Sequence, residues 1–333
     1  MSPPVSAAPA MGTAKTIESP DFNGCTALVL GAGASRPYGF PIGKELVKEI
    51  CDQFLGFFEA MKAYGGTCCE RRAKAEHFVR RLSDSTHSSI DDFLESNTDL
   101  LHLGKIAIAS CLLPREDESE LLRTKDWYEA LFDWWCEEPM KLAVITFNYE
   151  RSFEHWFWLT LNERFGPECA RDIMLINDTQ RIIIDHVHGH FGDLPWRPGD
   201  YDKVPYGLAP NEDLGERVME AARQLRLVFE PPSDRALAGD RPLLILASRV
   251  LFLGFGYDQR NLERIEPIWS GRNLCPTAEI FGTAYDPGGP TGQLARKAEQ
   301  LLPQWAGSDW HGELKVVPKK VIEAIKEPGR LGS

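Results

Sequence analysis

The chain has 333 residues, of which 43% are hydrophobic and 26% are charged, and it carries a formal net charge of −12 at pH 7. This composition is typical of a globular protein with one or two domains. The acidic balance argues against direct binding of nucleic acid, which needs a basic face that releases counterions from phosphates. It leaves room for a small anionic ligand, because backbone N–H groups bind anions without basic side chains.

Three further features narrow the class of protein. The first 20 residues are rich in Pro, Ala and Ser and lack the basic start and apolar block of a signal peptide, which predicts a disordered tail over 1–20. No apolar run has the length that spans a bilayer, so we expect no membrane association. The eight cysteines form no Cys-x-x-Cys pair, which argues against a zinc ribbon and favours reduced thiols in a cytoplasmic protein.

The apolar pattern, followed along the chain, alternates between short strands and helices. Strands are predicted at 26–30, 142–146, 173–176, 181–187, 249–253 and 279–281. Helices are predicted at 42–60, 71–82, 90–103, 106–113, 127–135, 152–161, 212–228 and 233–248. After residue 287 we expect helix and short strand to alternate.

This order of elements predicts an α/β fold with a Rossmann-like, doubly wound parallel sheet over residues 21–290. Residues 65–139 show no convincing strand pattern and are expected to form a helical insertion. Residues 291–333 are expected to form a C-terminal extension packed on this domain. Such sheets bind ligands at the carboxyl ends of their strands, so the candidate site lies in four loops. These loops follow Leu30, Thr146, Val187 and Leu253.

The first loop reads Gly31-Ala32-Gly33-Ala34-Ser35. A strand that stops at Gly-x-Gly lets the backbone approach a pyrophosphate closely. The dehydrogenase fingerprint has a third glycine where this chain has Arg36, so a phosphate loop is favoured over hydride transfer. A tight turn without any ligand is the alternative.

The second loop places Asn148 two residues after a buried strand, with Glu150 close behind. An amide at the sheet edge can bind sugar hydroxyls or orient a water molecule, and Glu150 can accept an N–H. Alternatively, both residues cap the helix that follows.

The third loop contains three alternating histidines, His186, His188 and His190. A strand would turn all three toward one face, which suggests a metal site, although the remaining ligands for the known families with this pattern are lacking. A histidine beside a sugar can instead act as a general base. A satisfied core histidine is the interpretation that fits His186 best.

The fourth loop reads Gly254-Phe255-Gly256-Tyr257-Asp258. This close-approach turn offers a second backbone cradle for a ligand. Asp258 and Asn261 are alternatively placed to cap the next helix.

Taken together, these loops resemble the sirtuin-like family over about residues 26–286, and within it the bacterial NAD-consuming branch associated with phage defence. The resemblance includes the Gly-Ala-Gly-Ala-Ser loop, Thr-x-Asn-Tyr-Glu, His-Gly-x-x-Gly, Gly-Phe-Gly-Tyr-Asp and the segment Ser88 to Glu95. It implies that Asn148 holds the nicotinamide ribose and positions water, that His188 is the general base, and that Glu150 meets the nicotinamide amide. It also implies a set of residues around the pyrophosphate, the adjacent ribose and the adenosine half: Gly31, Ala32, Gly33, Ser35, Gly254 and Asp258.

The positions at which the chain differs from the protein deacetylases of the family determine which activity we expect. The four zinc-binding cysteines of the protein deacetylases are missing, and Ile42-Gly43-Lys44 stands where they carry Asp-Phe-Arg. With water as acceptor, the resemblance implies an NAD+ hydrolase that needs no metal and releases ADP-ribose and nicotinamide. The alternatives are a non-catalytic NAD or ADP-ribose sensor, a protein ADP-ribosyltransferase or deacylase, and a zinc hydrolase. We expect a regulated antiviral effector that forms a homo-oligomer or works with a partner such as a translocase ATPase or an Argonaute-like protein.

Overall fold

The computed structural model describes residues 25–87, 89–137, 139–175, 181–198, 203–207, 213–227, 229–230, 244, 246–266, 274–286 and 292–326. The tail expected over 1–20 lies outside the described residues. So do most of the helix expected over 233–248 and position 88 of the segment that resembles the phage-defence branch.

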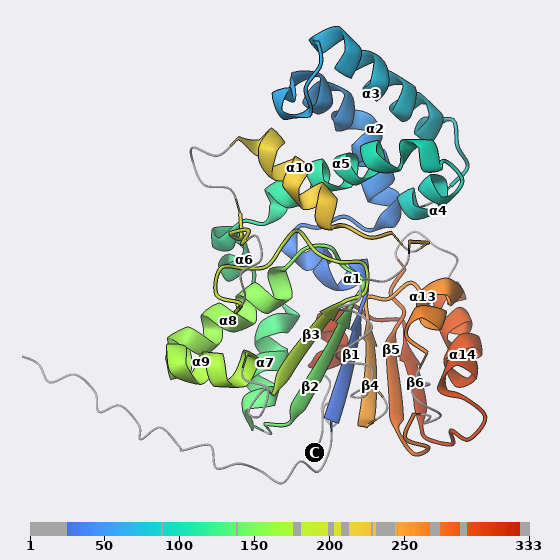
Figure 1. Ribbon diagram of the computed structural model, residues 1–333. Helices are drawn as coiled ribbons and strands as arrows, with labels where there is room; N and C mark the ends of the chain where they lie inside the picture. Colours follow the sequence, from blue (N-terminus) through green and yellow to red (C-terminus); the bar gives the residue numbers. More distant parts are fainter. Residues whose placement is uncertain are drawn as a thin grey trace, which may run out of the picture.

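The described residues form one six-stranded sheet in which all neighbouring strands are parallel, in the order β3-β2-β1-β4-β5-β6 (Figure 1). This confirms the predicted α/β, Rossmann-like, doubly wound fold. The order reverses between β1 and β4, which is the switch point where such sheets bind ligands. The strands are β1 (Cys25–Leu30), β2 (Lys141–Thr146), β3 (Ile182–His186), β4 (Ala247–Leu253), β5 (Glu279–Thr283) and β6 (Leu314–Val317).

The central strand β1 is buried along its whole length because helices cover both faces of the sheet. Successive side chains of a strand point to opposite faces. Leu28 and Leu30 accordingly pack into one hydrophobic core, and Ala27 and Val29 pack into a second core on the other face. The apolar run of β1 is therefore the element that joins the two halves of the protein.

Helices and short turns make up the described residues between β1 and β2. One group of helices stands over the carboxyl ends of the strands (Figure 1). It consists of α2 (Gly43–Ala60), α3 (Cys68–Ser83), α4 (Ile90–Glu95) and α5 (Leu101–Leu112) from this segment, and of α10 (Leu214–Gln224), which follows β3. We call this set the helical cap. Its hydrophobic core is continuous with that on one face of the sheet. The remaining helices are α1 (Ala32–Ser35), α6 (Glu118–Arg123), α7 (Trp127–Glu137), α8 (Ser152–Phe165), α9 (Pro167–Met174), α13 (Gln259–Arg264), α14 (Gln293–Ala306) and α15 (Val321–Ile325).

Three sequence predictions differ from the structure. The division between the helices predicted over 90–103 and 106–113 was wrong, because α4 ends at Glu95 and α5 continues without a break over Leu101–Leu112. The strand predicted over 173–176 was wrong at Ile173 and Met174, which form the end of α9. Ala170, Ile173 and Met174 are its buried residues, and this spacing is helical although Ile favours strands. The helix predicted over 233–248 ends too late, since Ala247 already begins β4.

The residues after 291 contain helices and a strand, as expected. The strand β6 pairs in parallel with β5, so this segment contributes the edge of the sheet. None of the described helices combines the length and the apolar character that crossing a membrane would require.

Candidate functional site

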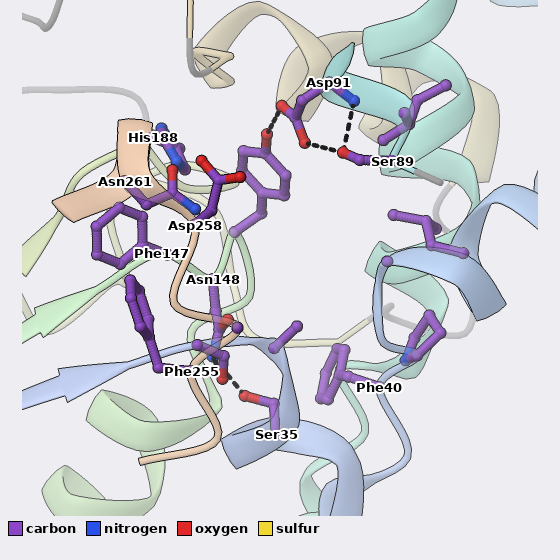
Figure 2. A pocket seen from close by; sticks show the side chains of 18 of the residues that line it. Ser35, Phe40, Ser89, Asp91, Phe147, Asn148, His188, Phe255, Asp258 and Asn261 are labelled. Carbon is purple, nitrogen blue, oxygen red and sulfur yellow. Dashed lines mark hydrogen bonds between the residues drawn. The ribbon is translucent and has the colours of Figure 1, made fainter. Parts of the chain in front are cut away.

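A cavity of about 320 Å³ opens at the carboxyl edge of the sheet, beneath the helical cap (Figure 2). Cavities of roughly 300–1,000 Å³ at this position typically bind small molecules. Its wall includes parts of all four loops, the start of α2, and α4 from the helical cap. Seven of the nine expected site residues line it: Gly31, Ala32, Ser35, Asn148, Glu150, His188 and Asp258.

The other two expected residues, Gly33 and Gly254, do not line this cavity. Gly33 donates its backbone N–H to the Gly254 carbonyl oxygen at 2.9 Å. A Cβ on Gly33 would lie 2.8 Å from that oxygen, and a Cβ on Gly254 would lie 2.0 Å from the Ala34 nitrogen. Gly254 also has a positive φ of 59°. These glycines allow the loops after β1 and β4 to pack against each other, a role that the sequence did not predict.

Asn148 donates three hydrogen bonds at the sheet edge. Its backbone N–H donates to the Thr146 hydroxyl at 3.1 Å, and its side-chain Nδ2 donates to the Gly31 carbonyl at 3.2 Å and to the Ser35 Oγ at 2.8 Å. No donor from the described part of the chain contacts Oδ1 of Asn148. The amide oxygen is therefore the atom that Asn148 offers to a ligand.

Glu150 is buried and has both carboxylate oxygens occupied. Oε1 accepts the Ser35 hydroxyl at 2.5 Å, and Oε2 accepts the Ser152 backbone N–H at 2.6 Å at the start of α8. Burial raises the pKa of this carboxyl group. Glu150 thus accepts the first N–H of α8 from a position just before the N-cap residue Arg151, while it also reaches back to the first loop.

His188 follows the end of β3 and is held by its backbone, whose carbonyl accepts the Arg226 N–H at 2.8 Å. Its ring stands edge-on to Phe147 at 5.3 Å between centroids. Burial lowers the pKa of His188 to about 3, and the charge of Arg264 adds to this effect. The imidazole is therefore neutral near pH 7, which is the form that accepts a proton.

Two buried polar atoms of the cavity wall, Nδ1 of His188 and Oδ1 of Asn261, have no hydrogen-bond partner among the described residues. Figure 2 shows the two side chains next to each other. Buried polar atoms are nearly always hydrogen-bonded, so unpaired ones in a cavity wall indicate a place for a polar ligand or water.

The other two histidines of the third loop lie apart from the cavity. His186 pairs through Nδ1 with the Asn148 carbonyl at 2.9 Å and through Nε2 with Glu154 at 3.2 Å. His190 accepts the Gly192 N–H at 3.1 Å. Because β3 ends at His186, the alternation does not continue. The rings of His186 and His190 lie edge-on with centroids 5.0 Å apart, whereas His188 lines the cavity beside Phe147. The described residues contain no group of three or more His, Cys, Asp or Glu side chains that could hold a metal ion.

The helical cap contributes one wall of the cavity, whose residues the sequence did not predict. Ser89, Asp91 and Asp92, from the start of α4, line the cavity. The Tyr149 hydroxyl donates to Asp91 at 3.2 Å (Figure 2). Resemblance over Ser88 to Glu95 was the only signal for this wall, and it carried no role for single residues.

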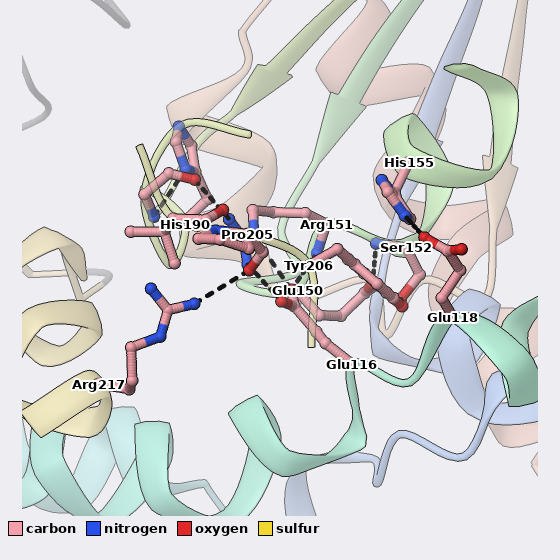
Figure 3. A network of polar contacts seen from close by, with 12 residues as sticks. Glu116, Glu118, Glu150, Arg151, Ser152, His155, His190, Pro205, Tyr206 and Arg217 are labelled. Carbon is pink, nitrogen blue, oxygen red and sulfur yellow. Dashed lines mark hydrogen bonds and ion pairs between the residues drawn. The ribbon is translucent and has the colours of Figure 1, made fainter. Parts of the chain in front are cut away.

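A second, deeply buried network supports the second loop from behind (Figure 3). The Arg151 guanidinium pairs with Glu116, and both side chains are fully buried. It also donates to the backbone carbonyls of Gly192 at 2.9 Å and Val204 at 2.6 Å. Through these contacts of Arg151, the network connects the loop after β3 and the segment before α6 to the loop that carries Asn148.

No family model matches this chain, and no curated protein matches it significantly in sequence.

Proposed function

We propose that this protein is an NAD+ glycohydrolase that cleaves NAD+ to ADP-ribose and nicotinamide. The observation that carries the proposal is that Asn148 and His188, which come from loops after different strands, line one cavity together with Gly31, Ala32 and Ser35. A position at the switch point of a parallel sheet suits a dinucleotide. NAD+ is the substrate in this proposal, and no step requires a metal.

Hydrolysis of the glycosidic bond of NAD+ requires few polar groups of the protein. When the glycosidic bond breaks, its electron pair leaves with the nicotinamide nitrogen, and the ribose develops oxocarbenium character. A water oxygen then forms the bond to the anomeric carbon and gives up a proton. Oδ1 of Asn148 is available to hold a ribose hydroxyl or this water, and the neutral His188 is available to accept the proton.

The charges of the cavity wall suit one end of this substrate. Asp91, Asp92, Glu150 and Asp258 line the cavity, and Arg260 is the one cationic residue among the described lining. An acidic surrounding favours a cationic nicotinamide ring. The aromatic side chains of Phe147 and Phe255, whose ring centroids are 5.1 Å apart, supply an apolar surface beside it.

A binding module that holds NAD or ADP-ribose without cleaving it is the second candidate. The low pKa of His188 favours this candidate, because a histidine with a pKa of about 3 is a weak base. Chromatography of NAD+ after incubation with the purified protein, alone and with candidate activators, separates the two. Release of nicotinamide that is lost in Asn148→Ala supports hydrolysis, whereas tight binding of intact NAD+ supports the sensor.

The biological setting is part of the same proposal and depends on the family resemblance. A cytoplasmic enzyme that destroys NAD+ has to be silent until it is needed. We therefore propose a regulated antiviral effector that is controlled by homo-oligomerisation or by a partner such as a translocase ATPase or an Argonaute-like protein.

A further inference from the structure

Three buried side chains form a continuous chain of hydrogen bonds that ends at the cavity. Ser35, Glu150 and Asn148 are 2%, 5% and 8% exposed. Ser35 donates its hydroxyl proton to Glu150 at 2.5 Å and accepts a proton from Nδ2 of Asn148 at 2.8 Å. The three residues come from two loops that are more than a hundred positions apart in the sequence.

The direction of this chain is set by Glu150. The Ser35 hydroxyl donates its single proton to Oε1 of Glu150, whose other oxygen is already occupied by the Ser152 N–H. The Ser35 oxygen can then only accept, and Asn148 has to present its amide nitrogen. The Gly31 carbonyl, an acceptor as well, requires the same orientation. Both contacts turn Oδ1 of Asn148 away from the first loop.

We propose that Glu150 and Ser35 are positioning residues that fix the orientation of the Asn148 side-chain amide and so present its Oδ1 to the ligand. This gives Glu150 a different role from the nicotinamide contact that the resemblance implied. The effect on catalysis rests on the proposed function, whereas the orientation of the amide does not.

Glu150→Gln is the sharpest test because it keeps the shape and changes the hydrogen-bond pattern. The buried Ser152 N–H needs an acceptor and holds the new amide oxygen, so the amide nitrogen faces Ser35 and donates to it. The Ser35 hydroxyl proton then turns to Asn148, where it competes with Gly31 for the orientation of the amide. The Asn148 side chain loses its single preferred orientation.

The matched control is Glu70→Gln on α3. Glu70 accepts the Thr67 backbone N–H at 2.7 Å and the Thr67 hydroxyl at 3.0 Å, which is the same pair of donor types. It does not line the cavity. This variant therefore loses the same kind of acceptor without touching Asn148.

The first measurement is hydrogen exchange of the Asn148 side-chain amide in ligand-free protein. NMR on protein with selectively isotope-labelled asparagine monitors the exchange, and the signal that is missing in Asn148→Ala identifies the Asn148 amide. We expect both Nδ2 hydrogens to be protected in the wild type and in Glu70→Gln, and to exchange at least about tenfold faster in Glu150→Gln. Unchanged protection in Glu150→Gln overturns the proposal. If Glu150→Gln does not fold, Ser35→Ala, which removes the central oxygen, takes its place. Faster exchange in Ser35→Ala supports the proposal, and unchanged protection overturns it.

The second measurement is the kinetics of NAD+ cleavage. We expect Glu150→Gln to lower kcat by about tenfold or more while KM stays within about twofold, because the amide acts on the reacting ribose. An unchanged kcat, or a change confined to KM, contradicts the positioning role. If the wild type cleaves no NAD+, the proposed function fails, and the exchange measurement still decides whether the three residues orient Asn148.

Discussion

Arg260 on α13 pairs with Asp92 on α4 and so connects the sheet side of the cavity to the helical cap. It also contacts Glu95 on α4 at 2.6 Å. Both Arg260 and Asp92 line the cavity, so this ion pair closes part of its rim. The position of α4, and with it the shape of the cavity, depends in part on this link.

Arg260→Ala should therefore weaken ligand binding more than it weakens the fold. The Arg260 side chain is 42% exposed, and exposed ion pairs contribute at most ~1 kcal/mol to stability. We expect KM for NAD+ to rise by about fivefold with a small change in Tm. Arg72→Ala, which breaks exposed pairs with Glu59 and Glu76 away from the cavity, is the control. Equal KM values in the two variants would contradict the role of this link.

Gly254→Ala should destabilise the protein strongly, whereas Gly256→Ala in the same loop should not. A methyl group on Gly254 meets the Ala34 nitrogen at 2.0 Å, and its positive φ adds strain. Nothing lies within 4 Å of the corresponding position on Gly256. We expect losses of ~2 kcal/mol or more for Gly254→Ala and less than ~1 kcal/mol for Gly256→Ala in urea unfolding. Similar values for both would show that the loops after β1 and β4 tolerate separation.

The low pKa of His188 predicts a pH dependence of stability. Burial lowers the pKa of His188 in the folded protein to about 3, below the ordinary value of 6.5. The unfolded chain therefore binds more protons between these values, and stability falls as pH decreases through this window. The contribution of one such group is about 1.4 kcal/mol per pH unit.

His188→Gln should remove this contribution, so that the free energy of unfolding falls less steeply in the variant than in the wild type between about pH 6 and pH 4. Urea unfolding at several pH values gives both slopes. Parallel slopes would mean that His188 titrates normally in the folded protein and that its ring is open to water.

The buried pair of Arg151 and Glu116 makes a prediction about stability alone. Arg151→Met leaves the Glu116 carboxylate buried without its cation, which should cost ~3–5 kcal/mol. Lys125→Ala, which breaks a pair with Glu129 where the lysine is 72% exposed, should have no measurable effect. Denaturant unfolding checks both. A small effect of Arg151→Met would indicate that water reaches Glu116 from outside the network.

Much of the fold followed from the sequence because its signals are local. The apolar runs of β1, β2 and β4, each followed within two residues by glycine or a polar residue, predicted both the strands and the loops of the cavity. Ile173 was misread because a strand-forming residue in a short apolar run does not show the period that its buried neighbours share. Periodicity needs several residues before helix and strand are distinguishable.

What the sequence could not provide are contacts between distant segments. Gly33 and Gly254 looked like ligand-binding glycines, yet each is required by the other's loop. The wall from α4 and the bond from Ser35 to Glu150 join residues that are separated by long stretches of chain. Residue pairs of this kind have no characteristic separation in the sequence, so a single sequence does not predict them and only the folded protein shows them.

The central claim is that Asn148 and His188 act together on the glycosidic bond of NAD+. The most direct test is incubation of the purified protein and its Asn148→Ala and His188→Ala variants with NAD+ in heavy-oxygen water, with mass spectrometry of the products. We predict that the wild type, alone or with one of the candidate activators, releases nicotinamide and an equal amount of ADP-ribose that carries the heavy oxygen, and that both variants lose this activity under the same conditions. Binding of NAD+ by all three proteins without any nicotinamide release, or equal release by the wild type and Asn148→Ala, would contradict the account.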